Sequence, residues 1–159
     1  MSTLEVKAIQ APTGYDLDMP AGHIVQVVNG VTSTSTSITS TSFVDTTLTV
    51  NITPKFATSK LLVIAEGSCQ VYDNGYVAMA FAQILRGSTA LKSIRYGAYV
   101  AAGSDTNWYG THTITYLDSP STTSQLTYKV QAKLTGGGHT TIWQPDSMPS
   151  TITVMEVAQ

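Results

Sequence analysis

Charged residues are scarce in this chain. Only 11% of its 159 residues are charged, and eight lysines and arginines against ten aspartates and glutamates leave a net charge of −2. Proteins that bind nucleic acid usually present a basic face, and anionic membrane surfaces attract clusters of lysine and arginine. Because the few cationic residues here are scattered along the chain, we expect neither nucleic acid nor an anionic membrane surface as a partner.

Cysteine is scarce, and long apolar runs are missing. Cys69 is the single cysteine, so the chain can form no internal disulfide and must be stabilised by its core and by association. It stands in an alternating apolar run without a neighbouring charge or histidine, which predicts a buried small side chain and not a nucleophile. No apolar stretch reaches the ~18 residues of a membrane span, and Glu5 and Lys7 interrupt any signal-peptide pattern. We therefore expect a soluble protein, made in a cytoplasm, without membrane insertion.

Patterns that carry catalysis or metal binding are absent too. The three histidines, His23, His112 and His139, lie in separate segments without the spacing of metal-binding motifs. Gly136–Gly138 lacks the lysine and hydroxyl of a phosphate-binding loop and is expected to be a turn. The sequence thus predicts a protein that is not an enzyme and that carries no cofactor and no metal.

Serine and threonine are abundant, and together they make up 41 residues. Between Val31 and Tyr72, a run rich in them leads into Leu48, Val50 and Ile52 at every second position. β-Branched side chains suit a pleated surface, and a period of two places one face of a strand in a core. The stretch therefore predicts β-strands, although residues 32–42 alone could also be a low-complexity linker or stalk.

The most apolar run follows within the same stretch. Leu61–Tyr72 alternates throughout, and Leu62 and Ile64 make its second face apolar at the start. Strands that are buried on both faces have nearly continuous apolar sequences. We expect a central strand here, covered on both sides.

Turn signals separate further predicted strands. Asn29–Gly30 favours positive φ at a tight turn and is expected to end a first strand over residues 22–29. Residues 76–85 are predicted as a strand because Arg86–Ser88 resembles a hairpin turn; a helix is the competing assignment, since alanine, methionine and leucine favour helices. Gln125–Leu134 has the cleanest alternation.

About eight such strands, with turns between them and no convincing helix, predict an all-β fold. The strand spacing indicates an antiparallel β-sandwich of the jelly-roll type. We place this domain at residues 22–159. Residues 1–21 contain Pro12 and Pro20, which prevent a long regular element, and are expected to form an extended N-terminal attachment arm.

Five stretches, covering roughly residues 20–158, carry a resemblance to a known family. They are AGHIVQVV, TSFVDTTLTVNITPKFATSKLLVIAEG, FAQILRGSTAL, YLDSPSTTSQLTYKVQAKL and STITVMEVAQ. In this order they resemble the globular domain of tailed-bacteriophage fibre and virion surface proteins. The resemblance implies a tumour-necrosis-factor-like jelly roll that is made in the host cytoplasm and assembles as a homotrimer on the virion surface.

The arm provides the first set of candidate functional residues. A complete tail fibre would carry a long shaft before its head, whereas about 21 residues precede the domain here. That length suits a capsid decoration, or cement, protein that clamps neighbouring capsid subunits. The arm would bind the major capsid protein, or a tail attachment protein, through its apolar side chains. These are Leu4, Val6, Ile9, Leu17 and Met19.

Aromatic residues near predicted strand ends provide the second set. Aromatic rings with a polar tip often make carbohydrate or protein contacts, although each ring could instead fill an end of the sandwich or line a trimer axis. The alternative function is the receptor-binding head of a short tail fibre that recognises host-surface glycan. Its exposed loop contacts would be Tyr96, Tyr99, Trp108, Tyr109 and Trp143.

Overall fold

The computed structural model describes residues 20–74, 79–97, 105–136 and 139–159. Within these ranges the regular elements are ten β-strands and one short 3₁₀ turn, η1 (Pro145–Ser147). The strands are β1 (Ile24–Thr32), β2 (Thr36–Ile38), β3 (Val44–Ile52), β4 (Lys60–Asn74), β5 (Met79–Arg86), β6 (Thr89–Gly97), β7 (Asp105–Asp118), β8 (Leu126–Leu134), β9 (Thr140–Trp143) and β10 (Ser150–Val157).

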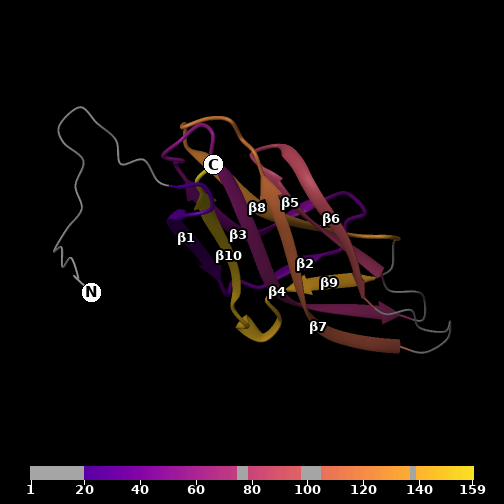
Figure 1. The fold of residues 1–159 in the computed structure, drawn as a ribbon. Helices are drawn as coiled ribbons and strands as arrows, with labels where there is room; N and C mark the ends of the chain where they lie inside the picture. The colour runs from indigo at the N-terminus through magenta and orange to yellow at the C-terminus, as the bar shows by residue number, and fades with distance from the viewer. Residues whose placement is uncertain (1–19, 75–78, 98–104, 137–138) are drawn as a thin grey trace.

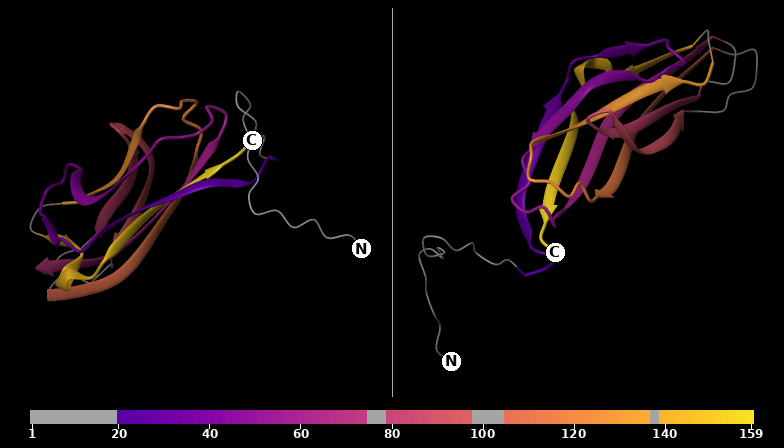
Figure 2. Two further views of the ribbon diagram at one scale, coloured as in Figure 1. Left: turned by 90° about the vertical axis from the view of Figure 1, so that its left-hand side faces the viewer. Right: turned by 90° about the horizontal axis from the view of Figure 1, so that it is seen from above.

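Two antiparallel sheets pack face to face (Figures 1 and 2). In the six-stranded sheet, β4 is central: β7 pairs along one edge, and β10 and β9 pair end to end along the other. β1 lies outside β10, and β2 lies outside β9. The four-stranded sheet has the order β3-β8-β5-β6. The predicted all-β antiparallel sandwich is confirmed.

The eight long strands pair in a nested order. The first pairs with the last (β1 with β10), the second with the seventh (β3 with β8), the third with the sixth (β4 with β7), and the fourth with the fifth (β5 with β6). A long antiparallel hairpin that rolls up on itself has this order. The order is consistent with the predicted jelly roll.

The core lies between the sheets and follows the alternation of the sequence. Every second residue is buried along β8 and β10 and along most of β3. On β4, Leu61, Val63 and Val71 are 0% exposed. Cys69 belongs to the same inward phase and is 1% exposed, and its burial raises the pKa of the thiol to about 12. The prediction that Cys69 is a buried small side chain is confirmed.

Residues 79–86 form a strand and not a helix. β5 pairs with β6 along one edge and with β8 along the other. Its helix-favouring residues are overridden by this pairing, and the small Ala80 and Ala82 are 0% exposed where the two sheets approach.

The predicted tight turn at Asn29–Gly30 is wrong, because β1 continues through both residues to Thr32. Gly30 pairs with Ile152 inside the ladder. A Cβ at Gly30 would lie 2.2 Å from the backbone oxygen of Thr49. Glycine is needed there because β1 passes close to the backbone of β3, not because the chain turns.

The hydroxyl-rich residues 32–42 lie inside the domain, as part of the sandwich. They include β2, which pairs with β9. Ile38 is the only apolar residue of the run and is 2% exposed. This buried side chain and the β2–β9 pairing exclude a free linker or stalk.

Glu156 on β10 faces inward and is 0% exposed. Its carboxylate accepts hydrogen bonds from the backbone N–H groups of Lys55 (2.8 Å) and Phe56 (3.0 Å) and from the side-chain amide of Gln26 (2.6 Å). Burial acts to raise the pKa of this carboxyl, but the donors outweigh burial and lower the pKa. Glu156 thereby fastens the loop between β3 and β4 to the last strand.

Replacing Gly67 by alanine should destabilise the fold by about 3 kcal/mol. The added Cβ would lie 2.2 Å from the ring of Trp143, which is 1% exposed and cannot move aside. Gly136→Ala is the matched control, because no atom lies within 4 Å of its Cβ position. Urea unfolding of both variants measures the difference, and equal midpoints would contradict the packing described here.

Candidate functional site

The outer face of the six-stranded sheet carries a row of apolar side chains. The register places Val27 opposite Met155, Met155 opposite Leu62, and Leu62 opposite Leu117. Directly paired residues point to the same face of a sheet, so four adjacent strands each contribute one apolar side chain. Val27 and Leu117 are 53% and 51% exposed, and Leu62 and Met155 are half-buried between them.

Neighbouring positions extend this row. Ile24, which is 56% exposed, pairs with Val157 beside the row, and Ile64 follows Leu62 on the same face of β4. We call the whole set the outer apolar patch: Ile24, Val27, Leu62, Ile64, Leu117, Met155 and Val157. The prediction that β4 is covered on both sides holds for its inner face. Among the described residues, its outer face is not overlaid by another layer.

Charge is nearly absent from this outer face. Among its outward residues in the ranges 24–31, 60–72, 107–117 and 151–157, the charged side chains are Lys60 and Glu66. They have opposite signs and flank the apolar rows. An apolar patch bordered by polar groups is typical of a contact surface.

The outer face of the four-stranded sheet is polar instead. Asp45 forms an ion pair with Lys129 at 3.0 Å and accepts a hydrogen bond from the Gln131 amide at 2.8 Å. Gln131 in turn accepts from Gln83 at 2.9 Å, and Ser93 donates to Gln83 at 3.3 Å. Burial acts to raise the pKa of Asp45, but the bonds from Lys129 and Gln131 lower it. The two outer faces therefore differ: one carries a network of charged and polar side chains, and the other carries the outer apolar patch.

The chain enters the domain beside the outer apolar patch. Gly22 donates a backbone hydrogen bond to Ala158 at 2.8 Å, and Ala158 donates one to His23 at 2.9 Å. These bonds tie Gly22 and His23, which follow the predicted arm, to the residue after β10, close to the C-terminus (Figure 1). The predicted contact residues of the arm lie outside the described residues: Leu4, Val6, Ile9, Leu17 and Met19.

Two of the aromatic residues predicted as exposed contacts are buried, so that prediction is wrong for them. Tyr96 is 4% exposed and Trp143 is 1% exposed. The Trp143 indole donates to the Tyr96 hydroxyl at 2.8 Å, and that hydroxyl lies 3.0 Å from the Thr141 hydroxyl. Burial raises the pKa of Tyr96. β9 lies in the sheet and not in a loop, which turns Trp143 into the core.

The other predicted aromatic contacts have different surroundings. Trp108 is half-buried and stacks on His112 with ring centroids 5.2 Å apart, so it belongs to the end of the core. Burial lowers the pKa of His112. Tyr109, on the opposite face of the same strand, is 55% exposed. Tyr99 lies outside the described residues. The structure thus keeps Tyr109 as an exposed candidate.

The described residues bring together no three histidine, cysteine, aspartate or glutamate side chains that could hold a metal ion. In the same part of the chain, no helix is long and apolar enough to cross a membrane.

The outer apolar patch was not identified from the sequence, although part of its signal is there. Leu62 and Ile64 mark a second apolar face on β4. The alternation of residues 108–117 and 151–158 supplies Leu117 and Met155 in the outward phase. What the sequence does not contain is the pairing that aligns these strands, because β1, β10, β4 and β7 are distant in the chain.

No protein-family model matches the chain, and no curated protein matches it. Among solved structures, it is similar to a chain in the structure of the infectious bursal disease virus Gt strain, at 12% identity and a TM-score of 0.39 over 97% of this chain and 43% of that one. The VP2 subviral particle of the same virus gives 14% identity and a TM-score of 0.36, over 93% of this chain and 46% of that one. Latent PorU from Porphyromonas gingivalis gives 8% identity and a TM-score of 0.36, over 89% of this chain and 14% of that one. The chain spans less than half the length of each, and likenesses of this size do not bear on function.

Proposed function

We propose that this protein is a non-enzymatic structural component of a tailed-phage virion. It acts as a surface-exposed homotrimer that decorates and cements the capsid through residues 1–21. The observation that carries the proposal is the contrast between the two outer faces, one with the outer apolar patch and one with the polar network around Asp45. The sequence resemblance of residues 20–158 to virion surface domains supports the same assignment.

Further copies of this chain are the proposed occupant of the outer apolar patch. The face bears one cation, Lys60, and one anion, Glu66, in the ranges described above, so copies that meet there do not repel one another. A strongly charged partner would meet little electrostatic complementarity on this face. Because the outer apolar patch lies on the six-stranded sheet, association through it leaves the polar outer face of the four-stranded sheet of every copy in water.

The position of the arm root supports a multivalent clamp. The arm leaves each copy beside the patch, at the Gly22–Ala158 hydrogen bond, so the arms of a trimer would emerge close together. Linked binding segments raise one another's effective concentration, and a ligand that binds only the assembled shell stabilises it by mass action. Three weak arms can therefore hold three or more capsid subunits firmly.

Removing residues 2–19 should abolish capsid binding and leave a folded trimer. Each arm contributes several apolar side chains, and burial of apolar surface is worth ~25 cal/mol per Å², so we expect an affinity loss of roughly 100-fold or more. The assay is cosedimentation of the purified protein with capsids that lack it. Full-occupancy binding by the truncated protein would overturn the role of the arm.

A substitution series separates side-chain contacts from the mere presence of the arm. Serine at Leu4, Val6, Ile9, Leu17 and Met19 together should reproduce the loss caused by the truncation. The matched control replaces polar arm residues by alanine and should keep binding: Ser2, Thr3, Gln10 and Thr13.

A second candidate function is the receptor-binding head of a short tail fibre that recognises host-surface glycan. One observation favours it: Tyr109 is 55% exposed and pairs with Gln70, ten residues along β4 from Lys60, which pairs with Val157 at the end of β10 near Gly22.

A further inference from the structure

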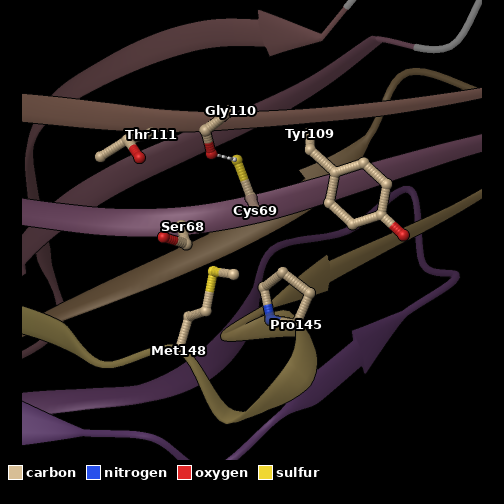
Figure 3. A pocket seen from close by; sticks show the side chains of 7 residues that line it. All are labelled: Ser68, Cys69, Tyr109, Gly110, Thr111, Pro145 and Met148. Atoms are coloured by element: carbon tan, nitrogen blue, oxygen red, sulfur yellow. Dashed lines mark hydrogen bonds between the residues drawn. The ribbon is translucent and has the colours of Figure 1, made fainter.

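A pocket of about 300 Å³ opens on the outer face of the six-stranded sheet, between β4, β7 and the η1 turn. β4 and β7 form one wall, and Pro145 and Met148 face them from the loop (Figure 3). The lining residues are Ser68, Cys69, Tyr109, Gly110, Thr111, Pro145 and Met148. The volume is at the low end for ligand sites and suits one sugar-sized ring.

The loop that closes this pocket has a strained backbone. Gln144, Asp146 and Ser147 have φ values of 57°, 54° and 58°, in the left-handed region that L-residues rarely adopt. Non-glycine residues stay in that region only where surrounding contacts hold them, and such residues gather at binding sites. Three such residues within four positions indicate that surrounding contacts hold the loop in one conformation.

Gln144 holds the loop in this conformation. Gln144 is 0% exposed, and its backbone N–H donates to the backbone carbonyl oxygen of Ser68 at 3.0 Å. In the orientation that satisfies both ends of its side-chain amide, the nitrogen donates to the Trp143 and Thr34 backbone oxygens, and the oxygen accepts from Ser150. The Met148 N–H donates to the Pro145 oxygen at 3.0 Å. The pocket is therefore preformed, which lowers the entropic cost of binding.

The lining determines the chemistry of the ligand. No lining residue is charged, so the site offers nothing to a phosphate or carboxylate, which arginine or lysine would hold. It combines an exposed aromatic ring, Tyr109, with the hydroxyls of Ser68 and Thr111. An aromatic ring packs against the C–H face of a sugar, and hydroxyls exchange hydrogen bonds with its equatorial oxygens.

We propose that this pocket binds a neutral pyranose residue of a surface glycan, with Tyr109 as the stacking platform. The proposal deepens the second candidate function and is independent of capsid binding. Along β7, Tyr109 lies eight residues from Leu117 of the outer apolar patch, roughly 27 Å at the rise of a strand. A trimer that forms through the patch can therefore leave the pocket open.

Binding is tested by NMR titration of the full-length protein with neutral methyl hexopyranosides and methyl N-acetylhexosaminides. We expect saturable shifts for at least one of them, with a Kd on the order of 1–10 mM, as expected for a single small ring. Tyr109→Ala should weaken binding roughly three- to tenfold, and Tyr109→Phe, which keeps the ring, should change it less than about twofold.

Thr111→Val and Thr113→Val form the matched hydroxyl pair, because both residues lie on the outer face of β7 but only Thr111 lines the pocket. The first should weaken binding and the second should not. Absence of saturable shifts with every sugar, or equal binding by wild type and Tyr109→Ala, would overturn the proposal. Because capsid cosedimentation is measured separately, the pocket can fail while the capsid role stands, and the reverse.

Discussion

Replacing Leu62 by glutamate should dissociate the proposed trimer into folded monomers of 16.9 kDa. Leu62 is at the centre of the row that runs from Val27 through Met155 to Leu117. A carboxylate there would have to be taken out of water in an apolar contact between copies, which costs several kcal/mol. The dissociation constant of the trimer should rise by roughly 100-fold or more.

Sedimentation velocity measures this change over a range of protein concentrations. Ser93→Glu is the matched control, because it adds the same charge to the exposed outer face of the four-stranded sheet. It should leave the trimer intact. Near-UV circular dichroism checks that the Leu62 variant is folded, as expected for a side chain that points away from the core. A wild-type monomer at micromolar concentration, or a trimer of Leu62→Glu, would contradict the proposed interface.

Replacing Glu156 by alanine should lower the free energy of unfolding by about 3 kcal/mol. The change leaves the N–H groups of Lys55 and Phe56 without their acceptor in a site where the carboxylate is 0% exposed. Glu156→Gln keeps one carbonyl oxygen near both donors and should lose about half as much. Urea denaturation at neutral pH measures both values. A loss below about 1 kcal/mol for the alanine variant would show that the β3–β4 loop does not depend on this carboxylate.

The same residue predicts a pH dependence. Glu156 has a folded-state pKa below its ordinary value of 4.5, so the folded state binds its proton less readily than the unfolded state does. The stability that this difference contributes is present above pH 4.5 and is lost as the pH falls through the folded pKa. The stability difference between wild type and Glu156→Gln should be constant near neutral pH and should shrink below about pH 4.5. A difference that grew on acidification would have the wrong sign.

The strands were predictable wherever the sequence alternates. The inward phase of Leu126–Leu134 and the strand over Leu61–Tyr72 follow from side-chain period alone, whereas β4 runs two residues further, to Asn74. Glu156 has a similar signal, since it stands in the phase of Ile152 and Val154. A charged residue in an inward phase predicts a buried carboxylate with donors around it, although the sequence does not say that Lys55 and Phe56 supply them.

The sequence-based predictions were wrong where the role of a residue depends on a contact with a segment that is distant in the chain. Gly30 has the local pattern of a turn, but it is glycine because the backbone of Thr49 passes beside it. Trp143 has the pattern of a loop residue between Gly138 and Pro145, but pairing of β9 with β4 places it under Gly67. Only tertiary pairing distinguishes these cases.

The two candidate sites are also predictable only in part, where their residues follow the pattern of a single strand. Half of the outer apolar patch is evident in the two apolar faces of β4, whereas the row across four strands needs their register. The pocket beside Tyr109 combines β4, β7 and a loop before β10, and its strained residues, Gln144, Asp146 and Ser147, have no local signature that would place them there.

The nested pairing of the strands also affects the order of events during synthesis. Of the ten strands described, β1 is made first and β10 last, yet they are neighbours, and Gly22 is tied to Ala158. Folds that depend on such distant pairings close slowly. Until residue 158 has been made, the face that carries the outer apolar patch is incomplete. A nascent chain therefore cannot present the complete outer apolar patch before its own sandwich is closed.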